Sequence, residues 1–315
     1  MKFTATNTAT GRFAILLIAA LVSSTIAVAD EPLSVDAAEV RPELVSCEIG
    51  SVSFRIDGPK LWTLSGFNYK NHSIATTDSA YGTVLNIDGV GLLGTAHFLN
   101  VPGQPGKIEK ENVTALQFFV DRHRVRPVDP QAELKGHAFR LMRSSEIRAV
   151  RLESEVSVEN DVLVETVRMQ ASEDTRLKLS YPLMYAWSPA MTDYLFGDDT
   201  GILKRGSFLA EGAKPGEGLE RTARWMAVYD SADGCGAVCL LTQHPASEDV
   251  WFQYTDAPGI YRKLRLMSFS EKTLPAGFDG TYQATIGFFS AEPATWEETA
   301  LDRLRALQSA KSQRN

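Results

Sequence analysis

Polar and apolar side chains alternate at every second position through much of the middle of the chain. Within residues 177–187 every odd position from Leu177 to Trp187 is apolar, whereas Lys178 and Ser180 at even positions are polar. Residues 149–158 repeat the pattern with aliphatic and charged side chains. Alternation with period two places successive side chains on opposite faces of a pleated strand, so the pattern predicts antiparallel sheet with one buried face.

Further short segments of this kind continue almost to the C-terminus, where the pattern changes. Apolar residues from Trp296 to Leu307 recur at helical spacing, and Thr295 with Glu298 forms a capping-box motif in front of them. The fold class predicted is all-β: a large two-sheet antiparallel β-sandwich with a short C-terminal α-helix. The predicted strands are 51–57, 61–69, 83–87, 113–121, 138–143, 149–158, 162–169, 177–187, 192–196, 224–229, 237–241, 250–254, 260–269 and 281–288.

Turn-forming residues predict how some of these strands connect. Glu159-Asn160-Asp161 and the segment 230–234 are each suited to a hairpin. Two other connections, 99–112 and 197–220, are longer and rich in glycine, the first also in proline. We predict loops in both, and we interpret 197–220 as a functional lid because it directly follows an aromatic strand.

The N-terminus has the features of an export signal. Lys2 and Arg12 precede a short apolar run, and Ala27-Val28-Ala29 offers the small residues that a signal peptidase recognises. The apolar run is too short to span a bilayer comfortably, although an uncleaved anchor is the alternative. We therefore predict a signal peptide at 1–29, an extended lead at 30–49 and one β-sandwich domain at 50–310. The mature protein is expected to be soluble and exported, periplasmic or extracellular.

Charge and cysteine content restrict the partners. Cleavage removes two of the 32 basic residues and leaves all 39 acidic ones, so the mature net charge is −9, which argues against a nucleic-acid partner but permits a local basic cleft. Cys47 either pairs with Cys235 or Cys239, or all three cysteines are small buried thiols. We predict no metal site and no cofactor.

The order of the elements resembles a known family. The hairpin series from Phe139-Arg140-Leu141 to Val167, the strand Tyr181-Pro182-Leu183-Met184-Tyr185, and the terminal order of strand 280–290 and helix 293–307 carry the likeness. Over about residues 50–308 they are similar to the galactose mutarotase-like supersandwich, which occurs in aldose epimerases and in the β domains of several polysaccharide lyases and glycoside hydrolases. The resemblance implies sugar handling, and the epimerase reaction itself does not follow from it.

Three residues are candidates for proton transfer. His97 lies at the start of the glycine- and proline-rich connection, and His244 closes a predicted strand. An imidazole titrates near neutrality and can act as general acid or base, although either ring could instead have a structural role. Tyr185 is the third candidate.

Four residues are candidates for saccharide binding. Arg140 and Arg143 stand three apart and so point to opposite faces of their strand, where one guanidinium could bind an anionic sugar or form an ion pair with Glu153 or Glu155. Trp187 and Tyr194 could stack on sugar rings, Trp187 from an exposed strand end, or belong to the core.

These observations lead to a functional hypothesis with a rival. The hypothesis is an exported carbohydrate-recognising protein, acting as a lyase or epimerase on anionic saccharides by general acid–base chemistry if it is an enzyme. The rival is a non-catalytic cell-envelope domain that binds carbohydrate or another protein.

Overall fold

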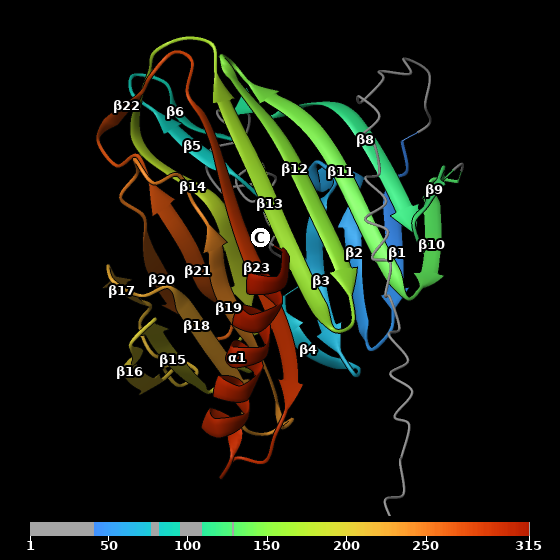
Figure 1. Cartoon of the computed structure of the whole chain (residues 1–315), viewed down its shortest axis with the longest axis vertical. Coiled ribbons are helices and arrows are strands. Elements are labelled where there is room, and N and C mark those ends of the chain that lie inside the picture. The colour runs from blue at the N-terminus through green and yellow to red at the C-terminus, as the bar shows by residue number, and fades with distance from the viewer. Residues whose placement is uncertain (1–40, 77–81, 95–108, 128, 315) are drawn as a thin grey trace, which may run out of the picture. The chain divides into compact units, whose positions relative to one another are not determined.

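Two β-sheets face each other across an apolar layer, and one helix lies outside them. The computed structural model describes residues 41–76, 82–94, 109–127 and 129–314, all of which belong to the unit Val35–Asn315. The two-sheet, all-β sandwich with a C-terminal helix that the alternation predicted is confirmed (Figure 1).

The first sheet, sheet A, contains 13 of the described strands. Its main path is β10 (Gln131–Gly136), β1 (Leu44–Ile49), β2 (Val52–Asp57), β3 (Thr63–Tyr69), β4 (His72–Ala75), β14 (Thr175–Trp187), β21 (Tyr261–Ser268), β20 (Trp251–Ala257) and β17 (Gly216–Glu220). Strands β5 (Val84–Ile87), β6 (Gly91–Gly94), β7 (Glu109–Lys110) and β22 (Lys272–Leu274) extend it beside β14. Pairing is antiparallel except at β1–β10 and β6–β7.

The second sheet, sheet B, is a ten-stranded antiparallel sheet within the described residues. Its order is β16 (Gly201–Ser207), β15 (Asp193–Asp198), β18 (Trp225–Asp230), β19 (Cys235–Gln243), β23 (Asp279–Ser290), β13 (Val162–Ala171), β12 (Val150–Glu159), β11 (Ala138–Ile147), β8 (Asn112–Val120) and β9 (His123–Val125). The predicted turn joins β12 to β13 through Asn160 and Asp161, both with positive φ, the geometry that two-residue hairpins favour.

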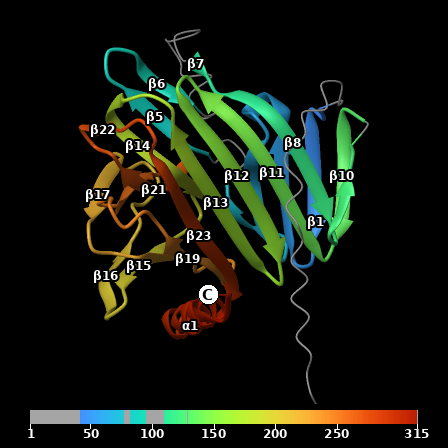
Figure 2. The same ribbon diagram turned by 45° about the horizontal axis from the view of Figure 1, so that its top comes forward.

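The inner faces of both sheets form one apolar core. Leu183 and Leu264 of sheet A belong to the same buried cluster as Leu152 and Val167 of sheet B. Figure 2 shows the strands of sheet B passing over those of sheet A. Because side chains alternate along each strand, the residues between these core positions must point outward.

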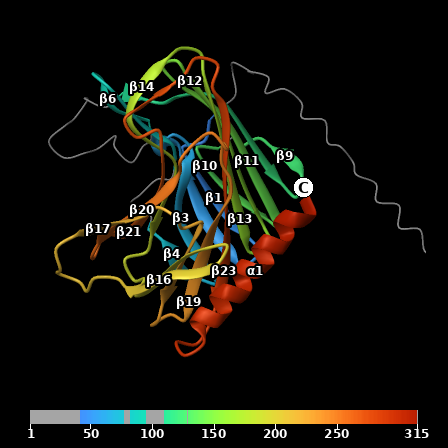
Figure 3. The ribbon, with the colours of Figure 1, turned by 60° about the vertical axis from the view of Figure 1, so that its left-hand side comes forward.

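The helix α1 (Trp296–Arg314) covers part of the outer face of sheet B (Figure 3). Its Ala300, Leu304 and Leu307 pack on Trp225 and Tyr229 in a second buried cluster. The Thr295 hydroxyl, in front of the helix, donates to the Glu292 carbonyl at 3.4 Å. No helix in the described part of the chain has the length and apolar composition needed to cross a membrane.

The interpretation of 197–220 as one long loop is wrong, since it contains the strands β16 and β17. Its glycines provide space for packing. A Cβ at Gly206 would lie 2.4 Å from the Tyr194 hydroxyl oxygen, and a Cβ at Gly218 would lie 2.2 Å from the ring of Tyr254. The two tyrosine rings lie 5.7 Å apart between β16 and β17, so they join the two sheets at this end.

Two further expectations concern the N-terminal part and the thiols. Strand β1 begins at Leu44, so sheet A starts inside the segment predicted to be an extended lead. All three cysteines are free and buried, which agrees with the second of the two alternatives for them. Burial raises the pKa of the Cys47 and Cys239 thiols, and such neutral thiols are unreactive.

The packing of α1 predicts a large effect of Leu304→Ala. Leu304 is 6% exposed among aromatic and aliphatic side chains of sheet B. Its truncation should lower the free energy of unfolding by about 2–5 kcal/mol, measured by urea denaturation. Ser309→Ala, at an exposed position of the same helix, is the control and should change it by less than about 0.5 kcal/mol. Equal effects of both variants would contradict the docking of α1.

Candidate functional site

The outer face of sheet A carries charged and aromatic side chains on its central strands. Lys263 and Arg265 of β21 alternate with the core residues Leu264 and Leu266, so they point away from sheet B. Their registered neighbours Thr255 and Gln253 on β20 share this face.

A small apolar cluster adjoins these charges. It consists of Val84, Tyr181, Met184 and Met267, with Trp251 packed against it. Together with the side chains of β21 it forms a mixed and largely buried cluster, with Tyr181 4% and Lys263 6% exposed, that we call the basic–aromatic patch. Its members are Tyr181, Trp251, Tyr261, Lys263 and Arg265.

Lys263 is the most perturbed group of the patch. It is 6% exposed, and its Nζ lies 4.4 Å from the centre of the Tyr261 ring. Burial, and then the positive charge of Arg265, lower the pKa of Lys263 from 10.5 to about 7, against the opposing effect of Glu217. Both causes disfavour the ammonium form, so the amine and the ammonium coexist near neutral pH.

Arg265 lies beside it and keeps a free hydrogen-bond donor. One terminal nitrogen donates to the Thr255 hydroxyl and to the Glu217 carboxylate, at 3.3 Å for the latter. Its Nε is buried and has no hydrogen-bond partner among the described residues. A buried N–H without a partner is costly, so this donor lowers the stability of the folded arrangement around Arg265.

The aromatic members border these charges. The guanidinium of Arg221 lies 5.3 Å from the centre of the Trp251 ring. Burial raises the pKa of Tyr181, so its hydroxyl stays protonated at neutral pH. Aromatic rings beside cations are suited to a ligand with apolar C–H faces and anionic groups.

The three candidates for proton transfer do not come together in the described structure. His97 lies outside the described residues, so its role stays a prediction. His244 follows β19, and its Nδ1 is 3.0 Å from the Pro245 carbonyl. Tyr185 is 5% exposed in the core between the sheets, where its hydrogen bond lowers the pKa of Glu165.

The proposed stacking residues are also inside the sandwich. Trp187 is 2% exposed and stacks on Tyr185 with ring centres 5.6 Å apart, so it is buried instead of lying at an exposed strand end. Tyr194 is buried among Phe196, Phe208 and Tyr254. These rings belong to the buried apolar core between the sheets.

The two arginines point to opposite faces of β11, as the spacing predicted. Arg140 is on the outer face of sheet B, 3.7 Å from the Glu155 carboxylate and over the ring of Phe119. Arg143 is 4% exposed inside the sandwich, where it pairs with Glu111 at 3.1 Å and donates to the Leu61 carbonyl. The ion pair with Glu155 considered from the sequence is therefore present for Arg140.

Sequence reasoning missed the basic–aromatic patch. The signal was available in residues 261–267, where Tyr261, Lys263, Arg265 and Met267 occupy every second position. Of the positions between and before them, Ile260, Leu264 and Leu266 are apolar. The segment therefore resembles a strand buried on both faces, and its polar side chains did not indicate a site. Among the described residues no three His, Cys, Asp or Glu side chains gather closely enough to hold a metal ion.

Comparison with known proteins gives structural likeness only. No protein family profile matches the chain, and no curated protein sequence does. It is similar to a galactose mutarotase-like protein from Lactobacillus casei ATCC 334, with 8% identity, coverage of 78% of this chain and 100% of the other, and a TM-score of 0.45. A galactose mutarotase-like protein from Clostridium acetobutylicum matches at 10% identity over 77% of this chain and 94% of the other, with a TM-score of 0.44.

An alpha-N-acetylgalactosaminidase from Bifidobacterium bifidum matches at 11% identity over 85% of this chain and 38% of its own, with a TM-score of 0.48. Likeness at this level assigns no role to any residue of this chain.

The buried carboxyl group of Glu165 predicts how stability depends on pH. Burial raises the pKa of Glu165 from 4.5 to about 7, against the effects of Tyr185 and Arg143. Because the folded-state pKa is the higher one, this group stabilises the fold fully below pH 4.5 and less as pH rises through 7. Between pH 5 and pH 8 the ionisation of Glu165 should lower the free energy of unfolding of the unmodified protein by about 2–3 kcal/mol. Glu165→Gln cannot ionise, so this part of the decrease should be absent from the variant in urea denaturation.

Glu146→Gln is the matched control for this variant. Glu146 is an exposed carboxylate on β11, so its replacement should leave the shape of the stability–pH curve as in the unmodified protein. A Glu165→Gln curve parallel to that of the control would show that Glu165 is ionised throughout.

Proposed function

We propose that this protein is exported and recognises an anionic saccharide through the basic–aromatic patch on the outer face of sheet A. The observation that carries the proposal is that two cationic side chains, Lys263 and Arg265, stand on the same face of β21, with the Nζ of Lys263 over the ring of Tyr261. A carboxylate or sulfate on the sugar would bind the cations, and the C–H face of the ring would lie on the aromatic side chains.

The net charge of the protein does not oppose this ligand. The acidic residues outnumber the basic ones by seven in the full chain, but the patch has two cations facing one carboxylate, that of Glu217. Glu217 is 61% exposed, so water screens it more than it screens the buried amine of Lys263. The local charge, and not the net charge, decides which ligand is attracted.

The near-neutral pKa of Lys263 also favours proton transfer. In its amine form Lys263 could accept the proton next to a uronate carboxylate, while Arg265 stabilises the negative charge that develops on that carboxylate. The sequence-based candidate His97 is a second possible base. The rival function is binding without catalysis, with Lys263 acting only as a cation.

Binding should depend on the charge of Lys263. Lys263→Met is expected to weaken the binding of trigalacturonate at least tenfold in isothermal titration calorimetry, which corresponds to about 1.4 kcal/mol. Lys178→Met, which removes an exposed lysine from β14 of the same sheet, is the control and should leave the affinity unchanged. Since only ammonium attracts the ligand, affinity in the unmodified protein should fall about tenfold from pH 6 to pH 8.

Lys263→Arg keeps the charge at every pH, so its affinity should vary less over this range. A pH-independent affinity of the unmodified protein would contradict the role of Lys263.

Catalysis is tested separately by incubating the protein with uronic-acid polymers and free aldoses. A lyase would release unsaturated products, and an epimerase would speed the interconversion of anomers. Either activity should fall at least 100-fold in Lys263→Met if Lys263 is the base, and in His97→Ala if His97 is. If neither product forms while trigalacturonate still binds, the protein is a binding domain.

A further inference from the structure

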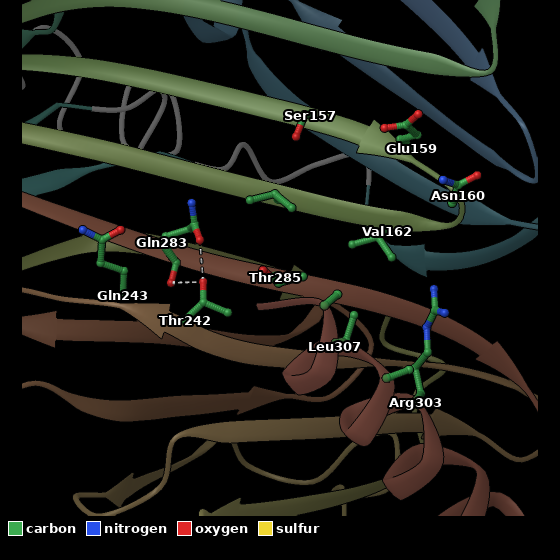
Figure 4. Close-up of a pocket in the computed structure, with 13 residues that line it drawn as sticks. Ser157, Glu159, Asn160, Val162, Thr242, Gln243, Gln283, Thr285, Arg303 and Leu307 are labelled. Carbon is green, nitrogen blue, oxygen red and sulfur yellow. Dashed lines mark hydrogen bonds between the residues drawn. The ribbon is translucent and has the colours of Figure 1, made fainter. Parts of the chain in front are cut away.

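A groove lies on the other side of the sandwich, between α1 and the outer face of sheet B. It encloses about 550 Å³, which is within the size range of small-molecule sites. The helix packs by its apolar side on β18 and β19, and the groove runs between its Leu307 side and strands β12, β13 and β23 (Figure 4). It is therefore separated from the basic–aromatic patch by both sheets.

Arg303 ties the helix to the sheet at one end of the groove. Its terminal nitrogen donates to the Asp161 carbonyl in the β12–β13 turn at 2.6 Å. The side chain crosses Gly287, where a Cβ would lie 2.5 Å from the Arg303 Nε. This Nε is buried against the sheet and has no hydrogen-bond partner among the described residues, so the Arg303 side chain is held in place by its terminal nitrogen and by its packing on Gly287.

The floor of the groove contains fixed amide and hydroxyl groups. Gln283 accepts a hydrogen bond from the Thr242 hydroxyl at 2.9 Å and donates one to Thr166 at 2.9 Å. This chain of bonds crosses β19, β23 and β13 and holds the Gln283 amide in one orientation. Figure 4 shows the contact between Thr242 and Gln283. A preformed polar floor lowers the entropy that a ligand must overcome on binding.

The remaining lining groups determine the chemistry of the ligand. Ser157 and Thr285 present hydroxyl groups, Gln243 presents an amide, and Val164 with Leu307 presents aliphatic surface. Hydroxyl and amide groups both donate and accept hydrogen bonds, as sugar hydroxyls do, and aliphatic side chains pack on the C–H faces of sugar rings.

The charge of the groove differs from that of the patch. Its lining contains one cation, Arg303, and one carboxylate, Glu159, so it favours an uncharged ligand. From this geometry we infer that the groove is a second site, which binds neutral saccharide. The inference rests on the groove alone and does not require that the patch bind anionic sugar.

The experiment titrates the full protein with cellotetraose, maltotetraose and mannotetraose and follows binding by calorimetry. At least one should bind, and Ala306→Trp, which fills the groove from an exposed helix position, should weaken that binding at least tenfold. Ser309→Trp adds the same ring to an exposed position of α1 outside the groove lining and should leave the affinity within twofold. Gln243→Ala removes an exposed amide of the groove and should weaken binding even if the tryptophan variant fails to fold.

The outcomes separate the two sites. Loss in Ala306→Trp or Gln243→Ala, with unchanged affinity in Lys263→Met, supports the groove. Loss in Lys263→Met with unchanged affinity in both groove variants overturns it and assigns neutral sugar to the patch. Absence of binding to all three tetrasaccharides at millimolar concentration also overturns it, whatever trigalacturonate does at the patch.

Discussion

Burial of the two inner sheet faces against each other is the interaction on which the rest of this structure depends. The side chains buried in this layer include Leu152, Val167, Leu183 and Leu264. Burial of their apolar surface stabilises the fold by roughly 25 cal/mol per Å². Because neighbouring residues on a strand point to opposite sides, this burial decides which side chains face outward. The outer faces are then free to differ from each other.

The two outer faces carry different kinds of side chain. The outer face of sheet B is partly covered by α1, and the uncovered remainder meets the helix in a neutral groove. The outer face of sheet A carries Lys263 and Arg265 beside aromatic rings. Burial lowers the pKa of Lys263 to about 7.

Charges inside the sandwich have a different role from charges on its faces. Arg143 pairs with Glu111, and Arg262 pairs with Asp256 and donates to the Leu209 carbonyl. Removing one partner of such a pair would leave a buried charge without compensation, which is strongly destabilising. These interactions tie strands and connections together, and they explain why an arginine singled out from sequence can be structural.

The sequence by itself determined the two-layer antiparallel architecture, the hairpin at Asn160-Asp161 and the terminal helix, because period-two and period-3.6 patterns and turn residues are local properties. It could not separate Trp187 and Tyr185 in the core from rings in a binding site, since both arrangements give the same alternation. Gly206 and Gly218 looked like loop residues, although they provide room for the Tyr194 and Tyr254 rings. Only the tertiary structure decided these contacts and the neighbours of Lys263, because they join strands distant in sequence and burial depends on every layer around them.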